Sequence, residues 1–164
     1  NLNNIDELND FVKNTMLYDQ QASTVYSALH DKVSFAKELP QDVLDYYRDV
    51  VLYRVYTYAK SYGTTMTALL QSGMFGTSYD SIDAYVEDVQ GSLNTITEQA
   101  LLMQAIAEKQ GLVCDTALMN QDFGKFYGST DPSAYISSYG ENYIKMNVLQ
   151  SEVMQNLIDN VKYE

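Results

Sequence analysis

Apolar residues recur at helical spacing along most of the chain, and the pattern is clearest after residue 79. In the middle of the chain the apolar positions are four and three residues apart, at Ile82, Val86, Val89, Leu93, Ile96, Ala100, Met103 and Ala107. This spacing predicts a long helix that buries one narrow stripe against other helices. Gly111 follows the last of these positions and should end the helix.

The same spacing predicts a first helix over about residues 4–32. Asp6 and Glu7 lie in its first turn, where carboxylates favour the positive end of the helix dipole. We expect Asp19, Gln20 and Gln21 to interrupt the inward stripe and to leave the middle of the helix poorly covered. The expected inward positions are Ile5, Leu8, Val12, Met16, Ala22, Tyr26 and Leu29.

A second helix is predicted from Pro40 to about Tyr62, because proline is tolerated in the first turn. Gly63 should end it in a left-handed conformation. Its expected inward positions are Leu44, Tyr47, Val51, Val55 and Tyr58, and further tyrosines widen the aromatic surface at Tyr46, Tyr53, Tyr56 and Tyr62.

A short helix is predicted over residues 64–72, followed by a glycine-rich loop over residues 73–78. Met74 and Phe75 in this loop are expected to be exposed. Ser78 or Asp80 is expected to cap the long helix that follows.

Two short helices are predicted over residues 115–127 and 131–139, and a long final helix after Gly140. The final helix should turn Met146, Leu149, Val153, Leu157 and Val161 inward. No segment shows the alternation typical of a strand. The predicted fold class is therefore all-α, in a single domain over residues 1–164.

The charge of the chain restricts its partners. It carries 22 acidic and 10 basic residues, for a net charge of −12, and most of the excess follows residue 74. Such a surface repels phosphate, which argues against nucleic acid and direct docking on ribosomal RNA, and the apolar runs are too short for membrane insertion. A basic or unfolded apolar partner is compatible, because 15 tyrosines and 7 methionines provide adaptable contacts.

No pattern in the chain indicates catalysis, a metal or a cofactor. The one histidine, His30, has no second ligand or nucleophile at a suitable spacing and is expected at a helix end. The one cysteine, Cys114, is expected to be a small packed residue. The carboxylates of Asp80, Asp83, Glu87 and Asp88 are expected on a solvated face at the start of the long helix. We therefore expect this chain not to be an enzyme.

The order of these features resembles the C-terminal domain of bacterial trigger factor. The resemblance rests on residues 39–44 (LPQDVL), a glycine-rich break, and residues 81–85 (SIDAY) at the start of a long helix. It is closest over residues 100–112 (ALLMQAIAEKQGL), and residues 126–128 and 148–161 fit the end of that domain. It covers nearly the whole chain, although each motif is a packing pattern.

The resemblance implies an extended helical body with two arms, similar to SurA-like chaperones, that binds unfolded or nascent polypeptides in an apolar cradle. The client contacts expected on this basis are Tyr46, Tyr53, Met66, Leu70, Met74, Phe75, Tyr127 and Tyr135. The alternative is a scaffold or dimerisation module, for which a homodimer is the expected form.

In trigger factors this domain accompanies a ribosome-binding domain and a peptidyl-prolyl isomerase domain. This chain contains neither and begins at Asn1, so we expect it to be a fragment of a longer protein. The family implies a cytoplasmic location. The low content of lysine and arginine leaves an exported or surface-anchored protein as a serious alternative.

Overall fold

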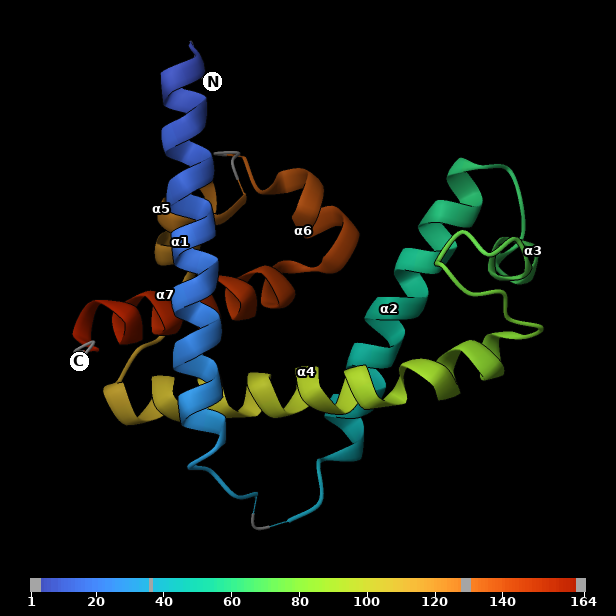
Figure 1. Cartoon of the computed structure of the whole chain (residues 1–164). Coiled ribbons are helices and arrows are strands. Elements are labelled where there is room, and N and C mark those ends of the chain that lie inside the picture. Colours follow the sequence, from blue (N-terminus) through green and yellow to red (C-terminus); the bar gives the residue numbers. More distant parts are fainter. Residues whose placement is uncertain (1–3, 36, 128–130, 162–164) are drawn as a thin grey trace. The chain divides into compact units, whose positions relative to one another are not determined.

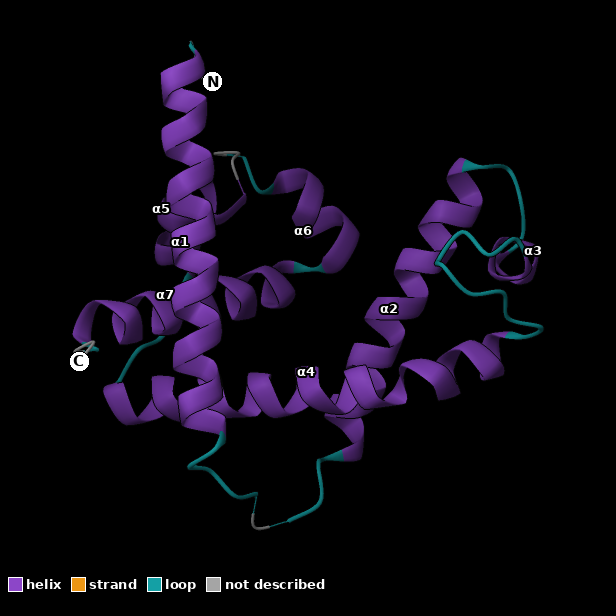
Figure 2. Cartoon of the chain, viewed as in Figure 1, coloured by secondary structure: helices purple, strands orange, loops and turns teal. Residues whose placement is uncertain are grey.

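The structure is a computed structural model that describes residues 4–35, 37–127 and 131–161. Within these ranges it contains seven helices and no strand (Figure 2), which confirms the all-α prediction. The helices are α1 (Ile5–His30), α2 (Gln41–Ser61), α3 (Met66–Gln71), α4 (Ile82–Gln110), α5 (Thr116–Tyr127), α6 (Ser133–Tyr139) and α7 (Glu141–Asn160).

The chain forms two compact units. The first unit comprises residues 1–34 and 103–164, and the second comprises residues 35–102. The first contains α1, α5, α6, α7 and the end of α4; the second contains α2, α3 and most of α4 (Figure 1). The expectation of one domain over the whole chain stays a prediction.

Two predicted glycine stops are confirmed in detail. Gly63 and Gly111 have φ values of 64° and 69°, which glycine adopts at no steric cost. After α2 the Thr64 N–H donates to the Ala59 carbonyl over 2.9 Å, and after α4 the Leu112 N–H donates to the Ala107 carbonyl over 2.9 Å. Both ends are therefore Schellman motifs, which satisfy carbonyls that the helix leaves open.

The starts of α3 and α5 are capped by side chains close to the predicted positions, whereas α2 and α7 begin without a side-chain cap. The Ala68 N–H donates to Thr65 Oγ1 over 3.1 Å at α3, and the Leu118 N–H donates to Asp115 Oδ1 over 2.8 Å at α5. The expected cap of α4 was wrong. Ser81 holds that position, with its Oγ accepting from the Ala84 N–H at 3.0 Å, whereas Ser78 Oγ donates to the Gln71 carbonyl.

The core of the second unit lies between α2, α3 and the first half of α4. Its buried members are Val55, Ala59, Leu69, Leu70 and Tyr85. Partly buried side chains complete it from all three helices and from the loop before α4, at Val51, Leu52, Met66, Phe75, Tyr79, Ile82 and Val89. This core is therefore mainly aliphatic, with Tyr85 as its one buried aromatic member.

The core of the first unit lies between α5, α6 and α7. Phe123 is fully buried. Its ring packs edge to face against the ring of Tyr135 on α6, with the two ring centroids 5.4 Å apart. The inward side of α7 agrees with the predicted one in part: Val153 is fully buried and Leu149 packs against this core, as expected, but the other buried residues of the helix are Ile144, Val148, Met154 and Ile158. The helix carries two overlapping apolar stripes, and packing against α5 and α6 selects the one that contains Ile144 and Val148.

The predicted stripe of α4 is largely correct, with one shift. Leu93, Ala100 and Met103 are buried, but Ile96 is 39% exposed and Thr97 is completely buried in its place. Thr97 Oγ1 has no hydrogen-bond partner among the described residues. A buried hydroxyl without a partner costs about 1–3 kcal/mol in lost solvation.

Thr97→Val is therefore expected to raise the free energy of unfolding by about 1 kcal/mol, since valine keeps the branched shape and removes the hydroxyl. Thermal unfolding followed by circular dichroism should show a midpoint about 2–4 °C higher. Thr95→Val is the matched control on the same helix. The Thr95 hydroxyl is exposed and donates to the Gly91 carbonyl, so this change should leave the midpoint nearly unchanged. If the unfolding midpoint of the Thr97→Val variant lies below that of the unchanged chain, the conclusion that the buried Thr97 hydroxyl lacks a hydrogen-bond partner is contradicted.

Candidate functional site

The first half of α1 exposes apolar side chains. Ile5 and Met16 are each 66% exposed, and Phe11 is 58% exposed. Six exposed side chains on this half are together called the apolar face of α1: Ile5, Leu8, Phe11, Val12, Met16 and Leu17. The prediction that Ile5, Leu8, Val12 and Met16 face inward was therefore wrong. The uncovered part is this first half rather than the middle of the helix.

Local interactions define the start of α1 in the absence of a core contact. Asn4 Oδ1 accepts from the Glu7 N–H at 2.8 Å, and the Asn4 amide donates back to Glu7 Oε1 at 3.1 Å. This reciprocal pair satisfies an N–H group that the helix cannot bond internally. The second half of α1 is anchored differently, because Val25 is buried and the helix contacts α7. The N-terminal end projects beyond α5 and α7 (Figure 1).

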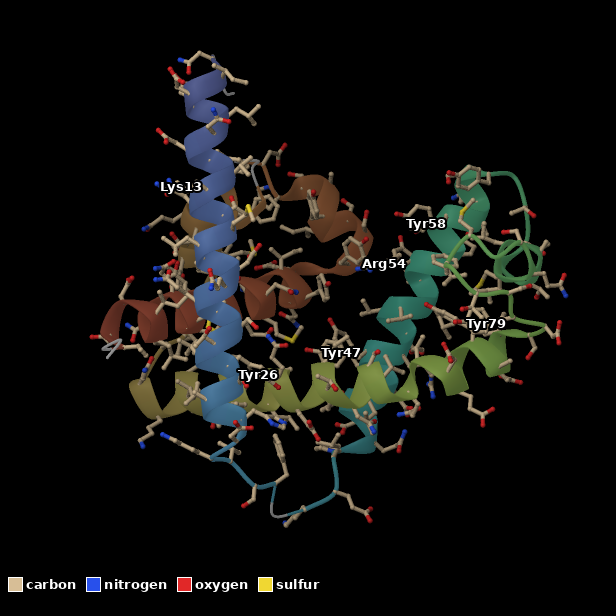
Figure 3. All side chains as sticks on the ribbon, viewed as in Figure 1. Lys13, Tyr26, Tyr47, Arg54, Tyr58 and Tyr79 are labelled. Atoms are coloured by element: carbon tan, nitrogen blue, oxygen red, sulfur yellow. The ribbon has the colours of Figure 1, made fainter. Side chains whose placement is uncertain are left out.

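A shallow hollow of about 690 Å³ runs along the apolar face of α1. Its lining combines four apolar and three polar side chains over about three turns of the helix: Leu8, Asn9, Val12, Lys13, Met16, Leu17 and Gln20. Figure 3 labels Lys13, which lies on this part of α1. Contiguous exposed apolar surface of this kind marks interaction sites in soluble proteins.

A second, larger groove lies between α1 and α7 within the first unit, with a volume of about 870 Å³. Its lining combines two aromatic rings, three carboxylates and three neutral polar side chains: Phe11, Asn14, Thr15, Tyr18, Asp19, Glu152, Gln155 and Asp159. No lysine or arginine is among these residues. Phe11 belongs both to this α1–α7 groove and to the apolar face of α1, so the two surfaces are continuous.

The electrostatics of the α1–α7 groove are negative. Burial raises the pKa of the Tyr18 hydroxyl, and the charges of Asp19 and Glu152 raise it further. The hydroxyl therefore stays protonated at neutral pH and remains a hydrogen-bond donor. Asp159 Oδ1 accepts from the Gln155 side-chain amide at 2.8 Å, which orders one carboxylate in the groove.

Three of the expected client contacts lie on the surface of the second unit. Tyr46 and Tyr53 on α2 are 38% and 37% exposed, and Met74 in the loop before α4 is 48% exposed. Tyr46 and Tyr53 are seven residues apart and share one face of α2. Figure 3 labels Tyr47, Arg54 and Tyr58 along the same helix.

The core of the second unit takes up three other expected contacts. Leu70 is fully buried, which corrects its assignment as a surface contact. Phe75 turns inward from the loop, and its ring lies 6.2 Å from that of Tyr58 and 6.0 Å from that of Tyr85. Met66 is half-buried against the same core. Of the two apolar residues expected to be exposed in the loop, only Met74 is.

The remaining expected contacts belong to the first unit. Tyr135 is 37% exposed, with its ring against Phe123. The side chain of Tyr127 lies outside the described part of the structure. The eight expected residues are therefore divided between the two units, and sequence reasoning missed the apolar face of α1. The sequence did contain one signal for this face. The polar residues from Asp19 to Gln21 interrupt the apolar stripe of α1, and they separate its exposed first half from its packed second half.

His30 and Cys114 are the two side chains that the sequence analysis considered for catalysis. His30 is the exposed last residue of α1, as predicted. Cys114 is buried, as predicted, and burial raises the pKa of its thiol, so the reactive thiolate is disfavoured. Among the residues that the structure describes, no three His, Cys, Asp or Glu side chains are grouped in a way that would hold a metal ion.

Comparison with known proteins yields no relative. No protein-family model matches the chain, no curated protein matches it, and no solved structure matches it. Within the described ranges, none of the helices combines the length and the apolar character that crossing a membrane requires.

Proposed function

We propose that this chain is a chaperone module that holds unfolded or nascent polypeptides on exposed apolar surfaces and assists their folding. One observation carries the proposal: six apolar side chains on the first half of α1 are exposed although the helix is capped and continuous. Burying them against an apolar chain would gain about 25 cal/mol per Å² of surface removed from water.

The character of the surface supports binding to many sequences. Leucine and methionine line the hollow on α1, and methionine re-packs easily because its side chain is unbranched. Tyrosines on α2 add rigid rings that keep a wet hydroxyl. Flexible surfaces of this kind accept many partners with modest affinity for each.

The finer proposal is that the chain belongs to a trigger-factor-like protein, with a helical body and two arms that form a cradle. It is supported by the order of sequence motifs over nearly the whole chain. On this proposal the prolyl isomerase and ribosome-binding activities belong to other domains of the parent protein. The family implies a cytoplasmic location, and export or surface anchoring is the alternative that composition supports.

Suppression of aggregation tests the proposed function. A client protein is diluted from denaturant with and without this chain, and light scattering is followed over time. We expect suppression at a near-stoichiometric ratio of chain to client. Unchanged scattering at several-fold excess of the chain would contradict chaperone activity.

A scaffold or dimerisation module is the second candidate, because helical spacing of exposed apolar residues also suits pairing with a second helix. It predicts a stable dimer and no suppression of aggregation. Light scattering coupled to size-exclusion chromatography separates the two. A monomer that suppresses aggregation supports the chaperone, and a dimer without suppression supports the scaffold.

A further inference from the structure

The apolar face of α1 is large enough to form most of an interface with a second copy of the chain. Its six exposed side chains leave on the order of 100 Å² each, or roughly 600 Å² together, uncovered. An interface of standard size buries about 800 Å² on each partner. The polar side chains of the hollow, at Asn9, Lys13 and Gln20, supply the remainder. The face therefore suits a second helix of the same kind, held with modest affinity.

A charged edge runs beside this face. Asp6, Asp10 and Lys13 follow one another at i, i+4 and i+7, so their side chains share one side of the helix. Lys13 also lines the hollow, which places this edge next to the apolar face. Among the described residues Lys13 has no ion-pair partner, so its ammonium group is available to another molecule. Figure 3 shows Lys13 on the projecting part of α1.

Two copies of α1 that run in opposite directions bring these charges together. When the two apolar faces overlap along their whole length, Ile5 lies opposite Met16 of the second copy. A two-fold axis then relates the helices, so the charged edge of one faces the same edge of the other. At a constant rise per residue, Lys13 comes level with the turn between Asp6 and Asp10 of the second copy. The symmetry repeats this pairing of opposite charges at a second place.

A parallel pair lacks this complementarity. It would place the charged edge against the other side of the face, which carries Leu8, Phe11 and Thr15 and offers no charge to match. It would also bring the positive ends of two helix dipoles together. Opposite directions leave room for the rest of each first unit, because the first half of α1 projects beyond α5 and α7 (Figure 1) and only the second half is anchored on α7.

We propose that a second copy of this chain covers the apolar face of α1 in an antiparallel helix pair, and that an unfolded client displaces it. The inference rests on the proposed function, because the dimer and the client use the same surface. In the dimer this surface is closed, so the fraction of free chain sets the apparent affinity for clients. Such a dimer opens when a client binds, which distinguishes it from a permanent scaffold.

Sedimentation equilibrium of the whole chain measures the pairing. At about 0.15 M salt, charges more than about 8 Å apart are largely screened, which limits repulsion between two acidic chains. We expect a dissociation constant on the order of 10 μM, because the interface is at the small end of the standard size. Lys13→Asp should raise this constant at least about tenfold, since attraction becomes repulsion at both symmetric places.

Lys37→Asp is the matched control, because it makes the same change of charge at an exposed position outside the helices. We expect it to leave the dissociation constant of the dimer nearly unchanged. Circular dichroism checks that all variants keep their helix content.

A mixture of complementary variants tests the direction of the helices. The basic variant Asp6→Lys, Asp10→Lys should not pair with itself, and Lys13→Asp should pair only weakly with itself. Mixed in equal amounts, the two should form a heterodimer about as tight as the dimer of the unchanged chain, because an antiparallel pair then sets lysines against aspartates along the whole edge. A parallel pair predicts no such recovery.

Client binding connects the dimer to the proposed function. A labelled, permanently unfolded client without net charge is titrated with the chain, and fluorescence anisotropy is followed. Lys13→Asp is expected to bind this client about threefold more tightly than Lys37→Asp at concentrations where the control is dimeric, because more of its surface is open. Sedimentation should show the dimer dissociating as client is added.

The possible outcomes separate the two proposals. A chain that stays monomeric at ten times the expected dissociation constant would overturn the dimer and leave the chaperone proposal standing. An equal loss of pairing in the control, or no heterodimer from the mixture, would overturn the antiparallel arrangement. A dimer that persists with client bound would overturn displacement. A dimer that binds no client would contradict the proposed function and leave the helix pair in place.

Discussion

Phe123→Ala is expected to lower the free energy of unfolding of the first unit by about 3–5 kcal/mol. Phe123 has no exposed surface and lies in the cluster formed by α5 and α7, with the ring of Tyr135 against it. Truncation removes the buried ring and leaves a cavity that the neighbouring helices fill only in part. Urea unfolding followed by circular dichroism should show a clearly lower midpoint.

Phe11→Ala is the matched control for this change, because it removes the same ring from a site that is 58% exposed. We expect it to change stability by less than about 0.5 kcal/mol. A loss of several kcal/mol at Phe11 would show that α1 is packed along its first half. A loss below about 1 kcal/mol at Phe123 would contradict the core described for the first unit.

The largest functional effect is expected from the triple variant Leu8→Gln, Val12→Gln, Met16→Gln. These residues line the hollow on the apolar face of α1, and glutamine keeps the helix propensity of the segment. Each apolar side chain buried against a client contributes on the order of 1 kcal/mol, so the variant should bind an unfolded client at least about tenfold more weakly. Titration of a labelled, permanently unfolded client measures this change.

Tyr53→Gln, Met74→Gln is the comparison variant, because it removes exposed apolar residues from the second unit. We expect it to weaken client binding by less than about threefold, within the range of a peripheral contact. If this variant loses binding while the triple variant on α1 keeps it, the binding surface lies in the second unit, which contains six of the eight contacts expected from the sequence. All variants should keep the unfolding midpoint within a few degrees.

The ends of the helices could be predicted from the sequence because their signals are local. Gly63 and Gly111 end helices through the φ value that glycine tolerates, and Thr65 and Asp115 cap the next ones through their own side chains. Each of these interactions joins residues a few positions apart. The cap of α4 was missed because three polar residues compete there, and the position of the first turn selects Ser81.

The faces of the helices were harder to predict because tertiary packing decides between neighbouring stripes. In α4, Thr97 takes the buried position that Ile96 was expected to hold. In α7, Ile144 and Val148 are fully buried although neither was expected to face inward. Neighbouring positions on a helix point about 100° apart. When the apolar surface of a helix is broad, the spacing of its apolar residues does not show which of two neighbouring positions faces the core.

The apolar face of α1 could not be found from periodicity for a related reason. Its residues have the spacing of a core helix, and this spacing is the same whether the face packs inside the chain or against another molecule. Leu70 and Phe75 were assigned to the surface for the opposite reason. They lie in or near a glycine-rich break, but both turn into the core of the second unit.

Methyl resonances of the methionines test the central claim most directly, because their exposure differs widely within one spectrum. Met16 on the apolar face of α1 is 66% exposed and Met74 is 48% exposed, whereas Met103 and Met119 are each 1% exposed. When an unfolded client is added, we predict that the Met16 methyl signal shifts or broadens at the lowest client concentration, while the Met103 and Met119 signals stay in place. A Met16 signal that does not change while the client is bound would contradict the account.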